Sequence, residues 1–166
     1  MLDIHNYDDM NTLFGLDGHD LRIEPFKADH LKLMDLKEVD LSIMNNHEDY
    51  FSYIDQANDV GTAYTFFDKE QPLNCWGIIP YWNGVVEFWM IPDISLPKHK
   101  FRFHKGSLKF FDLVANQLQL HRLQCTVCSS NVVAHKWIKA MYFTSEGVLR
   151  KFGNDQSDWE MYARIY

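Results

Sequence analysis

The feature that most constrains the fold is a change of periodicity at Pro92. Before it, strand-like runs follow one another at 61–68, 73–82 and 85–91. Asn83-Gly84 between the last two is a strong two-residue hairpin signal. After Pro92, apolar residues recur at helical spacing in 107–120 and 131–141, with a short apolar run at 123–127 between them. An antiparallel meander followed by a helical crossover predicts a mixed α/β sheet in a single domain.

Weaker strand and helix patterns occur towards the two ends of the chain. Residues 21–26 alternate as a strand does, and Asp29 could cap a helix that turns Leu31 and Met34 inward. Residues 46–58 have a second helical pattern, and 143–152 with 159–165 predict a closing hairpin. We expect residues 1–19 to form an N-terminal arm and 20–166 to form the domain.

Composition excludes several classes of protein. The 166 residues are 46% hydrophobic and 15% aromatic, as in a globular domain. Residues 1–20 contain no Lys or Arg, and no apolar run approaches the roughly 20 residues of a membrane-spanning helix, so we expect a cytoplasmic protein. Three cysteines do not make a disulfide framework, and Cys125 and Cys128 lack the second pair of a zinc site. His121 and His135 lack a third metal ligand at suitable spacing, so we expect no metal.

Charge is distributed unevenly along the chain. Residues 1–96 have a net charge of −13 and residues 97–166 one of +6, which together give −7. The positive part is densest in 98–105, which contains three Lys, one Arg and two His just before Gly106-Ser107 and a helical pattern. A helix N-terminus with added Lys and Arg suits a phosphate group. The alternative is a solvated basic segment that only offsets the acidic charge of the rest of the protein. The overall negative charge argues against a nucleic-acid partner.

Four segments resemble the GNAT superfamily of acyl-CoA N-acyltransferases, and its ribosomal-protein N-terminal acetyltransferases in particular. Phe88-Trp-Met-Ile-Pro92 is similar to the end of the family's fourth strand, and Arg102-Phe-His-Lys-Gly-Ser107 aligns with its pyrophosphate loop. His121–Ala134 resembles its fifth strand and the Asn-x-x-Ala helix start. Met141–Phe152 is similar to Leu-Gly-Phe-x-x-Glu-Gly-Val-Leu-Arg. The resemblance implies the GNAT fold and transfer of an acetyl group from acetyl-CoA to an amine acceptor.

The resemblance also implies a set of site residues. Glu87 is the candidate general base, although it could equally be a solvent-facing strand residue, and Asp93 is a weaker candidate. The proton donor is unassigned, with Tyr142, Ser129 and Ser130 in the neighbourhood. The cofactor contacts that the resemblance implies are Met90, Ile91, Arg102, Lys105, Gly106, Ser107 and Asn131.

Three departures from the family pattern keep a second interpretation open. Lys105 and Ser107 stand where the family loop has glycines, and Ile138 stands where many relatives have a Tyr that protonates the departing thiolate. The alternative to an enzyme is therefore a diverged, non-catalytic module, such as a phage accessory or virion protein.

Overall fold

The computed structural model describes residues 2–16, 19–45, 52, 54–55 and 61–166, and within them seven strands form one sheet in the order β1-β2-β3-β4-β5-β7-β6. The strands are β1 (Leu21–Pro25), β2 (Thr62–Asp68), β3 (Gln71–Trp82), β4 (Val85–Pro92), β5 (Arg122–Cys128), β6 (Thr144–Leu149) and β7 (Trp159–Ile165). The neighbours β4 and β5 pair in parallel, whereas the other neighbouring strands pair antiparallel. The predicted mixed α/β sheet is therefore confirmed.

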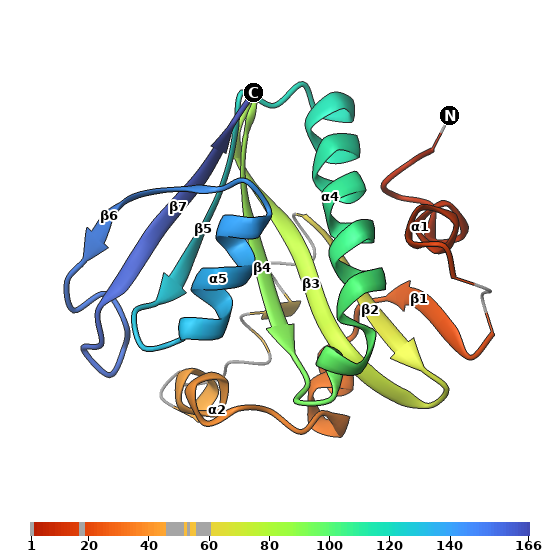
Figure 1. Cartoon of the computed structure of the whole chain (residues 1–166), viewed down its shortest axis with the longest axis horizontal. Coiled ribbons are helices and arrows are strands. Elements are labelled where there is room, and N and C mark those ends of the chain that lie inside the picture. Colours follow the sequence, from red (N-terminus) through yellow and green to blue (C-terminus); the bar gives the residue numbers. More distant parts are fainter. Residues whose placement is uncertain (1, 17–18, 46–51, 53, 56–60) are drawn as a thin grey trace.

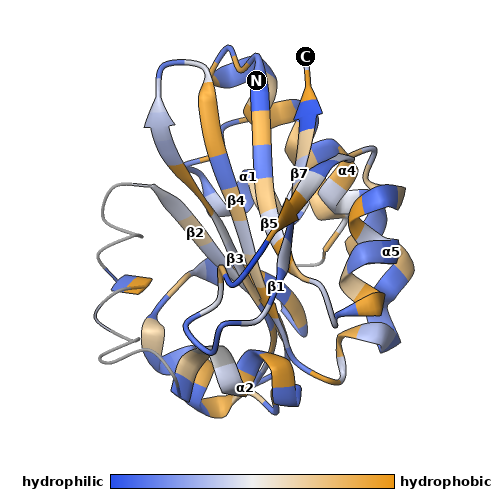
Figure 2. Cartoon of the chain, turned by 90° about the vertical axis from the view of Figure 1, so that its left-hand side faces the viewer, coloured by the Kyte–Doolittle hydropathy of each residue, from blue (hydrophilic) through white to orange (hydrophobic). Residues whose placement is uncertain are grey.

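Helices cover both faces of this sheet (Figure 1). Alternate residues of β4 face two separate cores: Val86 and Phe88 belong to the larger one and Ile91 to the smaller one, as the pleat of a strand requires. The larger core is shared with α1 (Tyr7–Phe14), α4 (Lys100–Gln117) and α5 (Val132–Ala140). The smaller core lies under the 3₁₀ helix η1 (Ala28–Leu33) and α2 (Glu38–Asn45). Both α2 and α5 contain hydrophilic as well as hydrophobic residues, as Figure 2 shows. Such a mixture is typical of helices that turn one face towards a sheet and the other towards solvent.

The first described segment, 2–16, packs into the larger core. The Asn6 side chain accepts hydrogen bonds from the N–H groups of Asp8 and Asp9 at the start of α1, and Gly15 ends the helix with a φ of 66°. Met10, Leu13 and Phe14 are buried. Residues 1–19 were expected to form an N-terminal arm, but the described residues of this segment share the core of the domain.

Helix α4 begins at Lys100, directly after the short 3₁₀ helix η2 (Leu96–His99). The start expected from the sequence was near Ser107, after a basic loop. The buried residues of α4 explain the earlier start, because their helical spacing begins at Phe103 and continues without a break. They are Phe103, Gly106, Ser107, Phe110, Phe111, Val114 and Ala115.

Two further expectations concern the region before β2. Residues 28–33 form a 3₁₀ helix with Lys27 at its N-cap, and Asp29 pairs with Lys32 at 2.6 Å instead of capping the helix. The helical pattern at 46–58 lies largely outside the described residues. Of the helices that the structure describes, none is both long and apolar enough to cross a membrane.

Candidate functional site

The sheet opens between β4 and β5. The two strands pair at three positions, Val85 with Arg122, Val86 with Leu123, and Glu87 with Gln124. Beyond Glu87 the strands diverge (Figure 1), while β4 stays paired with β3 as far as Pro92. Among the described residues, the edge of β4 that faces β5 therefore has no strand partner after Glu87.

A cavity of about 540 Å³ occupies this opening. Its walls include β4 from Glu87 to Pro92, β5 from Cys125 to Cys128, and residues of both α2 and α5. Because α2 and α5 cover opposite faces of the sheet, the cavity passes through the sheet and is bounded by both layers. A volume of this size is typical of small-molecule sites.

Four of the predicted site residues line the cavity: Glu87, Met90, Ile91 and Asn131. Glu87 is half-buried at the point where the strands separate, and its carboxylate accepts a hydrogen bond from the Tyr81 hydroxyl. The Gln124 side-chain amide lies 3.5 Å from the same carboxylate oxygen. Asn131 accepts a hydrogen bond of 3.1 Å from the Ala134 N–H and so caps α5 at the cavity wall.

The other four predicted residues, Arg102, Lys105, Gly106 and Ser107, do not line the cavity. They belong to the first turns of α4 and not to a loop. The backbone N–H groups of Gly106 and Ser107 are inside the helix, where they bond to the helix's own carbonyl groups. The phosphate-binding loop expected from the sequence is therefore not present in the form predicted.

Three of these four residues have contacts that explain their presence in α4. Arg102 donates a hydrogen bond to the carbonyl oxygen of Gly15, which ends α1. A Cβ atom on Gly106 would lie 2.1 Å from Cδ1 of Phe14, so only glycine fits there. Ser107 Oγ donates to the Phe103 carbonyl at 2.8 Å. Lys105 is exposed. This part of α4 is the surface on which α1 packs.

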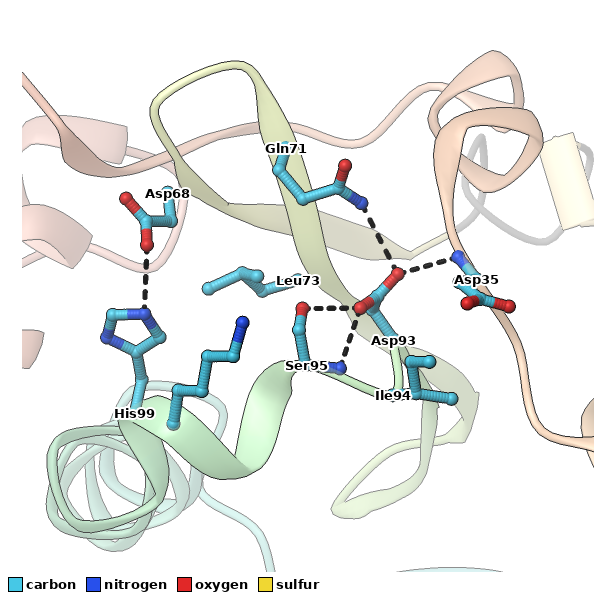
Figure 3. Close-up of a pocket in the computed structure, with 9 residues that line it drawn as sticks. Asp35, Asp68, Gln71, Leu73, Asp93, Ile94, Ser95 and His99 are labelled. Atoms are coloured by element: carbon cyan, nitrogen blue, oxygen red, sulfur yellow. Dashed lines mark hydrogen bonds and ion pairs between the residues drawn. The ribbon is translucent and has the colours of Figure 1, made fainter.

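The connection from β4 to α4 is fixed by Asp93, which is 2% exposed. Its carboxylate accepts hydrogen bonds from the Asp35 N–H at 2.6 Å, the Ser95 N–H at 2.8 Å and the Gln71 side chain at 3.3 Å, and also contacts the Ser95 hydroxyl (Figure 3). This network lies beside a separate pocket of about 390 Å³. Because these contacts occupy the carboxylate and hold the backbone in place, Asp93 is a poor candidate for the general base.

None of the residues considered as proton donors for a departing thiolate lies in the cavity wall with a proton to give. Ile138, at the position of the family's Tyr, is 2% exposed on the cavity wall and has no proton to give. Tyr142, Ser129 and Ser130 do not line the cavity. Burial raises the pKa of the Cys125 thiol, the cysteine of β5 nearest Glu87, so it is a poor nucleophile or acid.

Two features of the cavity were not predicted from the sequence: the hydrogen bond that Tyr81 donates to Glu87, and the presence of Asp40 in the cavity wall. The hairpin register could have indicated Tyr81, because Ile79 pairs with Glu87 and residues two apart in a strand share a face. No local pattern distinguishes Asp40 of α2 from the other acidic residues of the N-terminal half.

A seven-stranded mixed sheet that opens between a parallel fourth and fifth strand, with helices on both faces, is the fold of the GNAT acetyltransferases. A GNAT-family acetyltransferase from Bacillus anthracis superposes with a TM-score of 0.64 over 89% of this chain and 95% of that one, at 14% identity. The ribosomal L7/L12 alpha-N-protein acetyltransferase RimL, solved in complex with coenzyme A, gives 0.63 over 88% and 94%, at 12% identity. The ribosomal-protein-S5-alanine acetyltransferase from Vibrio fischeri gives 0.60 over 89% and 93%, at 13% identity.

These similarities confirm the GNAT fold predicted from the sequence, and the ribosomal-protein acetyltransferases are among the structures that share it. They are similarities of structure, at sequence identities of 12–14%. No protein-family model matches the sequence, and no curated protein matches it in a sequence search.

Proposed function

We propose that this chain is an N-acetyltransferase that moves the acetyl group of acetyl-CoA to a primary amine. The observation that carries the proposal is the cavity between β4 and β5, with Glu87 at the point where the strands part. It is supported by the fold shared with known acetyltransferases. The acceptor, a protein or a small molecule, approaches from the side of α2, and the acyl donor from the side of α5.

The unpaired edge of β4 suits the pantetheine arm of the donor. Met90 and Ile91 lie on this edge, and their backbone groups can bond to an amide-bearing chain as an added strand would. A backbone N–H at this edge would stabilise the oxygen of the thioester carbonyl as negative charge develops on it. Holding the amine and the thioester close together supplies a further part of the rate acceleration.

The carboxylate of Glu87 takes the proton that the ammonium group of the acceptor must lose before its nitrogen attacks. The new C–N bond then forms as the C–S bond breaks. Because Ile138 cannot protonate the sulfur, water passes to the thiolate the second proton that the nitrogen loses as the amide forms. The hydroxyl of Tyr81 holds the Glu87 carboxylate in position.

The diphosphate half of acetyl-CoA fits the structure less well than the pantetheine arm does. Its expected loop is part of α4, and Gly106, the one glycine in it, is covered by Phe14. This observation favours the second candidate function, a non-catalytic binding module built on the same fold. In that case the cavity binds a ligand but no acetyl group is transferred.

Two measurements separate these functions. Thermal unfolding with millimolar acetyl-CoA should raise the midpoint, because a ligand bound to the native state adds stability. Release of free thiol from acetyl-CoA should then be followed with a panel of amines. No shift of the midpoint and no thiol release would overturn the acetyltransferase and favour the binding module.

A further inference from the structure

Asp40 is an unusual residue of the cavity wall. It lies in the first turn of α2, and its Oδ2 atom is buried without a hydrogen-bond partner in the described part of the chain. Burial raises the pKa of this carboxyl group to about 6, with the positive charge of Lys37 opposing the shift. A buried polar oxygen without a partner costs free energy, and a bound ligand that donates a hydrogen bond to it would remove that cost.

The cavity around Asp40 is negatively charged. Its described lining residues include three carboxylates, Asp40, Glu87 and Asp155, and no Lys, Arg or His. Glu87 is engaged by Tyr81, and Asp155 accepts a hydrogen bond of 2.9 Å from the Ser157 N–H. Asp40 Oδ2 is a buried acceptor atom without a partner in the described part of the chain. The field of the three carboxylates attracts cations and repels anions.

The remaining walls are largely apolar and aromatic. Met44 and Ile54 line the cavity on the same side as Asp40. The aromatic lining residues are Tyr81, Phe88, Trp89, Trp137, Phe152 and Trp159. Such walls bind an apolar body, and aromatic faces also attract a cation.

We infer that the acceptor is a small protonated amine with an apolar body, and that its ammonium group is bound by the carboxylate of Asp40. This inference rests on the proposed function for the transfer of the acetyl group, but the binding of the amine can be measured without it. Asp40 is a binding residue in this assignment, and Glu87 remains the group that accepts the proton.

The test uses three probes of matched shape: 2-phenylethylamine, the neutral 2-phenylethanol and the anionic 3-phenylpropionate. Calorimetric titration at pH 7.5 without acetyl-CoA should show binding of the amine, and much weaker binding of the alcohol and the acid. Asp40→Asn should weaken amine binding roughly 10- to 100-fold, as expected for loss of a charged hydrogen-bond partner. Glu38→Gln is the matched control, because Glu38 lies in the same turn of α2 but is exposed and away from the cavity.

The outcomes for the inference and for the proposed function are distinct. Equal affinity for the three probes, or amine affinity unchanged in Asp40→Asn, would overturn the role of Asp40 even if acetyl-CoA binds. Amine binding that depends on Asp40, without any binding of acetyl-CoA, would support the inference and overturn the acetyltransferase. Unfolding curves of both variants check that each is folded.

Discussion

The ring of Phe14 on α1 lies directly against Gly106 of α4, so close that a Cβ atom at Gly106 would be 2.1 Å from Cδ1 of the ring. Phe14 also contacts Trp76 of β3 and Phe103 of α4, at ring-centroid distances of 5.6 and 5.9 Å. The glycine thus lets α1 approach α4 and fill the larger core.

Gly106→Ala should lower the free energy of unfolding by about 1–3 kcal/mol, because the added methyl group overpacks the contact with Phe14. Denaturant unfolding measures the change. In the background of Phe14→Ala, which removes the ring, the same substitution should cost little, since alanine favours a helix over glycine. Equal costs in the two backgrounds would contradict the contact.

Arg102→Gln should loosen α1 by removing its hydrogen bond to the Gly15 carbonyl, and should leave acetyl-CoA affinity within about twofold. Hydrogen exchange of the α1 amides and calorimetric titration with acetyl-CoA measure the two effects. Lys105→Gln is the control, because Lys105 is exposed on the same part of α4. A loss of acetyl-CoA affinity of tenfold or more in either variant would restore the phosphate site expected from the sequence.

Glu87→Gln should lower kcat roughly 100- to 10,000-fold, because the amide cannot accept the proton of the acceptor. Acetyl-CoA affinity should change little, which titration can verify. The exposed Glu70, whose side chain is 97% accessible, provides the control Glu70→Gln. Normal turnover by Glu87→Gln would remove Glu87 as the base.

The stability of Asp40→Asn should depend on pH in a defined direction. The folded-state pKa of Asp40, about 6, lies above its ordinary value of 3.8, so the folded protein holds this proton more tightly than the unfolded chain does. The carboxyl group therefore destabilises the fold at pH 7, and this effect fades as the pH falls through 6 towards 4. Thermal unfolding should show Asp40→Asn more stable than the wild type at pH 7, by a margin that shrinks at pH 5. A margin that grows on acidification would contradict the raised pKa.

Strands β3 and β4 and helix α5 could be predicted from the sequence because their signals are local. The Asn83-Gly84 turn and the alternating runs on either side of it indicate β3 and β4, and the stripe of Ala134, Trp137 and Ile138 indicates α5. The Asn131 cap marks the start of α5. Each of these features depends on residues a few positions apart.

Local patterns were insufficient where residues distant in the sequence decide the structure. Gly106 in a basic segment resembles a phosphate loop when read locally, but its neighbour in the fold is Phe14, some ninety positions earlier. Asp40 faces the cavity because α2 packs over the opening between β4 and β5, which no local pattern in α2 reveals. Glu87 and Asn131, which line the cavity, belong to segments with recognisable spacing.

The opening between β4 and β5 divides the walls of the cavity between segments that are far apart in the chain. Asp40 and Met44 come from the first third of the sequence, whereas Asn131 and Trp137 come from the last third. A mutation in one wall need not disturb the other. Ligand preference on the α2 side can therefore drift during evolution, or be redesigned in the laboratory, while the α5 side and Glu87 are kept.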